Sequence, residues 1–149
     1  MPTVKRQIKK IVKYDRNPRH NTNAIEPLLE SLRKHGQVKP IILSAKNYPF
    51  KDEVVCCGHS TLLALEKFGA TEVDCVIHRF SSEKEFADYN IRDNKTSEYA
   101  EWDESEYNAL VSDFELDFDV EVSDLGIDDE PEDQPEDKGK CGECGRKIK

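Results

Sequence analysis

Apolar residues recur at helical spacing in the first third of the chain. Between positions 25 and 32 they fall at i, i+3, i+4 and i+7, which predicts a helix over about 24–35 with one buried face. Asn23 and Glu26 have the spacing of a capping box at its start, and Gly36 follows as a C-terminal stop. The polar positions between these apolar residues are expected to face water.

Three further helices are predicted where a capping residue precedes apolar positions with similar spacing. Ser60 is positioned to cap a helix that Gly69 ends, and Ser82 to cap a more polar helix. Asp103 opens the last helix, against which Trp102, the only tryptophan, is expected to pack.

Four short runs rich in isoleucine, valine and cysteine lie before and between these helices and have the composition of strands. They cover 7–13, 40–45, 53–57 and 71–80. The second and third runs are joined by a short loop and are expected to pair as a hairpin. Strands and helices in this order predict an α/β (α+β) fold in which a small mixed sheet is packed with helices.

Charge divides the chain into segments of different character. Residues 1–25 carry seven lysines and arginines against one acid, whereas residues 113–137 carry thirteen acids and no base, so the net charge of −9 arises in the tail. Such an acidic, proline-containing region cannot bury enough apolar surface to order itself. We therefore expect one domain over 1–127 that includes a C-terminal helical extension, an acidic disordered linker over 128–140 and a short tail over 141–149.

The same composition bears on location. No apolar run approaches the roughly 20 residues that a membrane span needs, and the N-terminus lacks the apolar core of a signal peptide. Cys56, Cys57 and Cys75 lie inside apolar runs, where free cysteine acts as a small hydrophobic residue, so no disulfide framework is expected. These features indicate a cytoplasmic protein with no membrane partner.

Several segments together resemble the ParB/sulfiredoxin family, specifically the N-terminal domain of ParB-like proteins. They are "NPRHN" from position 17, "IEPLLESLRKHGQVKPIIL" from position 25 and "VVCCGHSTLLALEKFGATEVDCVI" from position 54, in the order and at the spacing of that family. "DNKTSEYAEWDESEYNAL" from position 93 is similar to the extension found in ParB-like domains of phages and of polypeptides that carry DNA methyltransferase domains. The resemblance implies a ParB/sulfiredoxin-like fold.

This resemblance also implies a nucleotide site. Known members bind CTP in chromosome-partitioning ParB and ATP in sulfiredoxin, with the phosphates over the glycine turn that opens a helix. A helix start presents free backbone amides, which attract anions. We therefore expect a nucleoside triphosphate, CTP or ATP with Mg²⁺. The expected phosphate-binding residues are Gly58, His59, Ser60 and Thr61 in the turn, with Asn17 and Arg19 from the earlier segment.

Two positions of the turn depart from the relatives. Partitioning ParB proteins have a pair of arginines there, whereas this chain has Thr61 in place of the second guanidinium, and a hydroxyl does not supply its charge. Sulfiredoxin requires a nucleophilic cysteine just after the glycine, and this chain has His59. A sulfinic acid reductase is therefore not expected, whereas His59 has the chemistry to orient a phosphate, to act as a general base or to have a structural role.

Cys141 and Cys144 have the spacing of a zinc knuckle near the end of the sequence. A closed zinc site needs four ligands, so this pair is half of a site. A truncated ribbon, a zinc ion shared between two chains of a homodimer, and a vestigial motif all remain open.

For function, we expect a ParB-like module of DNA metabolism from a phage or mobile element, which responds to a nucleotide or recruits a partner. Its expected partners are DNA or a DNA-processing protein, such as a methyltransferase or a phage packaging or replication component. The basic N-terminal segment is a candidate DNA contact or a solvated face. One alternative is a nuclease or nucleoside triphosphatase, for which Asp15 and Glu30 are the obvious acidic candidates. The other is an adaptor that docks a DNA methyltransferase.

Overall fold

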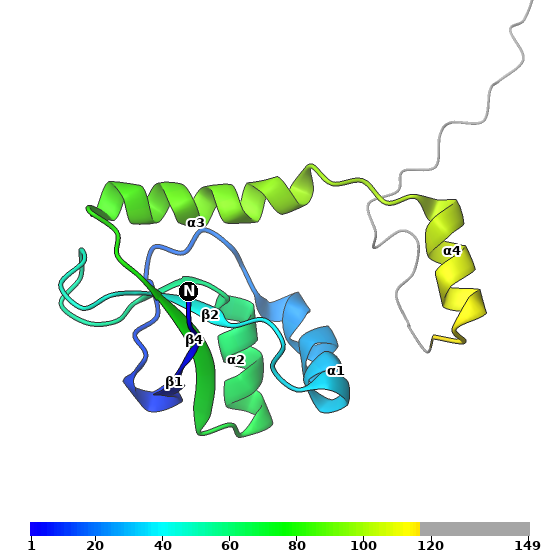
Figure 1. Cartoon of the computed structure of the whole chain (residues 1–149), viewed down its shortest axis with the longest axis horizontal. Helices are drawn as coiled ribbons and strands as arrows, with labels where there is room; N and C mark the ends of the chain where they lie inside the picture. Colours follow the sequence, from blue (N-terminus) through cyan, green and yellow to red (C-terminus); the bar gives the residue numbers. More distant parts are fainter. Residues whose placement is uncertain (117–149) are drawn as a thin grey trace, which may run out of the picture. The chain divides into compact units, whose positions relative to one another are not determined.

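The computed structural model describes residues 1–116, which belong to two compact units. The first unit spans Met1–Tyr99 and the second begins at Ala100. The elements of the first unit are β1 (Val4–Gln7), α1 (Ile25–His35), β2 (Ile41–Ser44), β3 (Val55–Cys57), α2 (His59–Phe68), β4 (Glu72–His78) and α3 (Glu83–Glu98), with 3₁₀ turns at Ile8–Lys10 and Thr22–Ala24 (Figure 1). The predicted linker over 128–140 and tail over 141–149 lie outside the described residues.

The four strands form one mixed sheet, as the sequence predicted, and their order is β1-β4-β2-β3. β4 pairs antiparallel with β1 and parallel with β2, so that Cys75 lies opposite Val4 on one side and Ile41 on the other. β2 and β3 pair antiparallel, which confirms the predicted hairpin, although the register shifts at Ile42 and Leu43. The parallel pairing of β2 with β4 needs a long connection between these two strands, and β3 and α2 provide it.

The outer edge of β3 is covered by the N-terminal segment. Val12 forms a parallel bridge with Val54, in which the Val12 N–H donates to the carbonyl of Glu53 at 3.2 Å. The N–H of Val55 donates in turn to the carbonyl of Val12 at 2.9 Å. This bridge satisfies backbone groups that an open strand edge leaves exposed.

Two apolar clusters fix the helices on the sheet. The first joins α1 and α2, which lie side by side in Figure 1, to one face of the sheet. Its buried members are Ile8, Leu29, Leu32, Ile41, Leu43, Val55, Leu62, Ala64, Leu65, Val73 and Cys75. The second cluster holds α3 against the other side of β3, through Val54, Cys56, Cys57, Phe80 and Phe86. Along β2, Ile41 and Leu43 belong to the first cluster and Ile42 packs against the second, as the pleat of a strand requires.

Three local predictions were wrong. The strand predicted over 7–13 is mostly a 3₁₀ turn and a single bridge, because β4 begins at Glu72 and the pairing with β1 ends at the bond from the N–H of Ile8 to Thr71. Asn23 lies inside the 3₁₀ turn that leads into α1, so it forms no capping box with Glu26. Ser60 is not a cap, since α2 already begins at His59 after Gly58. The other predicted helix boundaries were close to those observed.

The second unit contains α4 (Glu104–Asp113). Asp103 is its N-cap, as predicted, and accepts a hydrogen bond from the N–H of Glu106 at 3.0 Å. Trp102 packs against the helix, with its ring edge-on to that of Tyr107 at 5.7 Å between centroids. Within residues 1–116, every helix is too short or too polar to cross a bilayer.

Candidate phosphate-binding site

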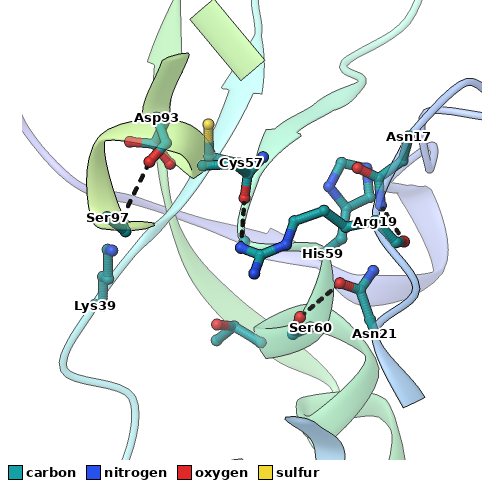
Figure 2. Close-up of a pocket in the computed structure, with 12 residues that line it drawn as sticks. Asn17, Arg19, Asn21, Lys39, Cys57, His59, Ser60, Asp93 and Ser97 are labelled. Carbon is teal, nitrogen blue, oxygen red and sulfur yellow. Dashed lines mark hydrogen bonds between the residues drawn. The ribbon is translucent and has the colours of Figure 1, made fainter. Parts of the chain in front are cut away.

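A cavity of about 170 Å³ lies where β3 turns into α2 (Figure 2). Four parts of the first unit form its walls: the loop before α1, the segment just before β2, the turn from β3 into α2 and the C-terminal half of α3. The lining residues are Asn17, Arg19, Asn21, Lys39, Cys57, Gly58, His59, Ser60, Thr61, Asp93, Asn94 and Ser97. All six residues that the sequence singled out for phosphate therefore line one cavity.

Gly58 makes the turn between the strand and the helix. Its backbone is left-handed, with φ 96° and ψ 25°, a conformation that glycine adopts without strain. A Cβ atom at this position would lie 3.3 Å from Cγ1 and 3.4 Å from Cα of Ile41, so β2 leaves little room for a side chain. The turn therefore requires glycine for both its backbone conformation and its close approach to β2.

The backbone amides at the start of α2 form one wall of the cavity. The first helical hydrogen bond runs from the N–H of Leu62 to the carbonyl of Gly58 at 2.9 Å. The amides of His59, Ser60 and Thr61 precede it and have no carbonyl one turn back within the helix. Such amides carry the positive end of the helix dipole and suit an anionic ligand.

Polar side chains tie the loop before α1 to the two helices. The Ser60 hydroxyl donates to Asn21 Oδ1 at 2.8 Å, and Asn17 Nδ2 donates to the carbonyl of Arg19 at 3.2 Å. Arg19 extends across the cavity in Figure 2, and its Nη1 donates to Asn94 Oδ1 at 3.0 Å. The loop is thus held over the start of α2 by hydrogen bonds to both neighbouring helices.

The cavity combines two cations with one carboxylate. Arg19 and Lys39 carry the positive charges, and Asp93 on α3 carries the negative charge. Burial, followed by the nearby Lys13 ammonium, lowers the pKa of His59, which keeps its imidazole neutral at pH 7. The His59 Nε2 atom is buried and has no hydrogen-bond partner among residues 1–116. Lowered basicity makes this histidine a neutral polar group rather than a third cation.

Cys57 lies in the cavity wall beside Asp93 but has poor nucleophilic character. The hydrogen bond with the Cys56 thiol, together with burial and the nearby Asp93 carboxylate, raises the pKa of the Cys57 thiol. Its exposed fraction is only 8%. The thiol therefore stays protonated at neutral pH, and a thiolate is what nucleophilic attack requires.

Sequence reasoning missed the contribution of α3. Asn90, Asp93, Asn94 and Ser97 fall at i, i+3, i+4 and i+7, so one face of this helix is polar. Asn90 is buried and bonds the carbonyl of Cys56, and the other three residues line the cavity. The sequence did carry a signal for this site, because polar residues of α3 occupy the helical spacing that core residues usually occupy. By contrast, the acidic candidates Asp15 and Glu30 do not line the cavity.

Most cations of the basic N-terminal segment are already paired with acids of the same unit. The ion pairs are Lys5 with Asp74, Arg6 with Glu53, Lys13 with Glu66 and Arg16 with Glu83. Pairing lowers the net positive field that this segment presents. Four of the seven bases therefore contribute to ion pairs within the unit, although Lys5 and Arg16 stay largely exposed.

The fold and this strand-turn-helix site define a ParB-like domain of the ParB/sulfiredoxin type. Residues 3–94, more than half of the chain, match the ParB N-terminal domain family, and the protein belongs to this family. None of the curated proteins matches the chain.

Solved structures share the fold. The C-terminally truncated chromosome-partitioning protein ParB from Caulobacter crescentus, complexed with CTP-gamma-S, superposes with a TM-score of 0.61 at 17% identity. The match covers 77% of this chain and 66% of that one, so this chain spans just under two thirds of that ParB's length. The same ParB complexed to the centromeric parS site gives a TM-score of 0.50 at 16% identity, over 76% of this chain and 59% of that one. For sulfiredoxin from Arabidopsis thaliana the TM-score is 0.49 at 22% identity, and the match covers 62% of this chain and 99% of that one.

Proposed function

We propose that this protein is a nucleotide-responsive ParB-like module of DNA metabolism, and that the cavity at the start of α2 holds phosphate groups of a nucleoside triphosphate. The observation that carries the proposal is the convergence of four separate chain segments on one small polar cavity at a helix N-terminus. Helix N-termini with free amides are established anion sites. The cavity volume is below the range of roughly 300–1,000 Å³ typical of whole-ligand pockets, which favours phosphate rather than the entire nucleotide inside it.

Arg19 is the residue best suited to replace the missing guanidinium. Thr61 offers only a hydroxyl at the turn, whereas Arg19 enters the same cavity from the loop before α1. A guanidinium forms two parallel hydrogen bonds with phosphate, which a hydroxyl cannot do. In this proposal Arg19 and Lys39 supply the positive charge, and the amides of residues 59–61 supply the remaining donors.

The relatives support a link between nucleotide and DNA. The ParB structure with the same fold is complexed with CTP-gamma-S, and a second structure of that ParB is complexed to parS. We therefore propose CTP or ATP as the nucleotide and DNA as a partner of this chain. A phage or mobile-element origin, a methyltransferase or phage packaging or replication partner, and a homodimer remain predictions.

Metals have a limited place in this proposal. Mg²⁺ usually binds through one or two carboxylates together with nucleotide phosphates, and Asp93 is the carboxylate of the cavity. Among residues 1–116, no group of three histidines, cysteines or acids is arranged to hold a metal ion. Any Mg²⁺ would therefore depend on the phosphates for most of its ligands. Cys141 and Cys144 lie outside the described residues, and zinc binding there stays a prediction.

A nuclease or nucleoside triphosphatase is the second candidate. One observation favours it: Asp93 places a carboxylate in the same cavity as the phosphate-binding residues. Release of inorganic phosphate from CTP or ATP, and cleavage of plasmid DNA, should be measured on the wild type and on Asp93→Asn. Loss of either activity in the variant, with nucleotide binding retained, would favour an enzyme over a binding module.

The test of the proposed function is thermal unfolding of the full chain with CTP, ATP and GTP, each with and without Mg²⁺. A ligand that binds only the folded state at one hundred times its Kd stabilises it by about 2.7 kcal/mol, which raises the melting temperature by roughly 10 °C or more for a domain of this size. Arg19→Ala should abolish most of the shift, whereas the exposed Arg33→Ala on α1 should retain it and is the matched control for lost charge.

Thr61→Arg is the gain-of-function arm of the same experiment. It restores a guanidinium to the turn and should strengthen binding by about 1.5–3 kcal/mol, the range for hydrogen bonds to charged groups. If neither the wild type nor Thr61→Arg binds any nucleotide while both remain folded, the turn is only a connection between strand and helix. The adaptor function would then replace the present proposal.

A further inference from the structure

The second unit carries an exposed apolar stripe. Tyr107, Leu110, Val111 and Phe114 fall at i, i+3, i+4 and i+7 and therefore share one face of α4. No residue of α4 is buried, and Leu110 and Phe114 are 52% and 69% exposed. Trp102 is 56% exposed and packs its ring against Tyr107. These five residues are the α4 stripe, and a helix face of this kind is typical of proteins that dock into an apolar groove.

Acidic residues border the α4 stripe. Helical spacing places Glu104 on one side of it and Glu106 and Asp113 on the other. The surrounding sequence has no compensating charge, because positions 96–137 contain eighteen acids and no lysine or arginine. A surface with an apolar centre and a negative border is complementary to an apolar groove with a positive rim.

The same charges disfavour the other occupants. The acidic sequence over 117–137 has no base to pair with the border of the stripe, and DNA is itself an anion. A second α4 would bring the same negative border. Cations of a second N-terminal segment are largely paired already, as in Lys13 with Glu66 and Arg16 with Glu83.

We propose that the α4 stripe is a docking surface for a partner protein whose apolar groove is rimmed by lysines or arginines. Trp102, Leu110 and Phe114 are the large side chains that enter the groove, and the bordering carboxylates meet its rim. This surface is separate in sequence from the residues that line the cavity, so failure of nucleotide binding leaves the inference standing.

Trp102 allows a direct test, because it is the only tryptophan of the chain. The probe is a synthetic amphipathic helical peptide of leucine and lysine, which has an apolar face bordered by lysines. Titration into the full chain at low salt should give a saturable blue shift of Trp102 emission that weakens as salt is added. The same peptide with glutamate in place of lysine should give no saturable shift.

Variants that leave the net charge unchanged distinguish docking of the α4 stripe from simple charge attraction. Leu110→Ser combined with Phe114→Ser should weaken peptide binding by about tenfold or more, since two groove-filling side chains are lost. Phe68→Ser, which removes a half-exposed ring from α2, should stay within about twofold of the wild type. Circular dichroism on each variant checks that the first unit remains folded.

Two results would overturn the inference. Equal binding of the lysine peptide by the wild type and the double variant would show that the α4 stripe is not involved. A dimer of the free wild type in analytical ultracentrifugation, which the double variant dissociates, would assign the α4 stripe to a second copy of this chain instead.

Discussion

Arg6 on β1 and Glu53 just before β3 form an ion pair with two hydrogen bonds. Arg6 Nε donates to Glu53 Oε2 at 2.7 Å, and Nη2 donates to Oε1 at 2.9 Å. The Glu53 side chain is only 14% exposed. The hydrogen bonds from Arg6 hold the pKa of the Glu53 carboxyl below its ordinary value, although burial acts in the opposite direction. This pair links the start of the chain to the hairpin 47 residues later.

The Glu53 carboxyl should make the fold sensitive to acid. A group whose pKa is lower in the folded protein stabilises it above the unfolded pKa, near 4.5, and that contribution is lost as the pH falls through the folded pKa. Glu53→Gln should therefore lower the free energy of unfolding by about 1–3 kcal/mol at pH 7, and its difference from the wild type should shrink below about pH 4. Urea unfolding at several pH values measures both effects.

The exposed carboxylate of Glu72 on β4 provides the control. Glu72→Gln should change the free energy of unfolding by no more than about 0.5 kcal/mol at pH 7. If the loss in Glu53→Gln is the same at pH 3 as at pH 7, the charge of Glu53 is not its cause.

Asn90 should stabilise the packing of α3 against the sheet. It is 1% exposed, and its Nδ2 donates to the carbonyl of Cys56 on β3 at 2.5 Å. Asn90→Leu removes this donor and leaves a buried carbonyl unsatisfied, which should cost about 1–3 kcal/mol in the free energy of unfolding. Lys84→Leu, at an exposed position of the same helix, should cost less than about 0.5 kcal/mol. Equal costs would mean that leucine on α3, rather than the lost hydrogen bond, is responsible.

Local signals in the sequence predicted most of the fold. Ser82 and Asp103 cap the helices that they were expected to cap, and Gly36 and Gly69 end theirs, because these roles depend on neighbours within one turn. The N-terminal segment was misassigned for the opposite reason. Its pairing with β4 ends at the bond from Ile8 to Thr71, and no local pattern indicates where a partner strand 60 or more positions away begins.

The candidate site was predictable only in part. The glycine turn and the loop before α1 were found through a family resemblance, whereas α3 was not. Arg19 and Asn94 are hydrogen bonded across 75 positions, and spacing along the chain carries no information about such a pair. The spacing of the polar residues on α3 was visible in the sequence. That these residues face the first unit follows only from the packing of Phe86 against β3.

The three cysteines of the first unit should resist thiol reagents while the protein is folded. Cys56 and Cys75 are fully buried, and burial raises the pKa of Cys75 to about 11. At pH 8 a thiol with that pKa is about one thousandth thiolate. In a Cys141→Ser and Cys144→Ser background, an aromatic disulfide reagent should label the chain at least about a hundredfold more slowly in buffer than in urea. Fast labelling of Cys57 in buffer would contradict the raised pKa and reopen thiol chemistry at the cavity.

A comparison of Gly58→Ala with Gly69→Ala separates the cost of backbone strain from the cost of a steric contact. Both have left-handed backbones, with φ 96° and 87°, so alanine is strained at either position by about 1–2 kcal/mol. A Cβ at Gly69 meets no atom within 4 Å, whereas one at Gly58 meets Ile41 at 3.3 Å. Gly58→Ala should therefore be more destabilising than Gly69→Ala in urea unfolding, because β2 or the turn must also move.

The same pair of variants tests the cavity. Movement of the turn at Gly58 shifts the amides of His59, Ser60 and Thr61, so Gly58→Ala should weaken CTP binding by about tenfold or more, in line with the loss of well-placed donors to a charged group. Gly69→Ala lies at the other end of α2 and should leave the affinity unchanged. Calorimetric titration at a temperature where both variants are folded measures the difference. If Gly58→Ala binds CTP as tightly as Gly69→Ala does, the phosphates do not rest on the start of α2.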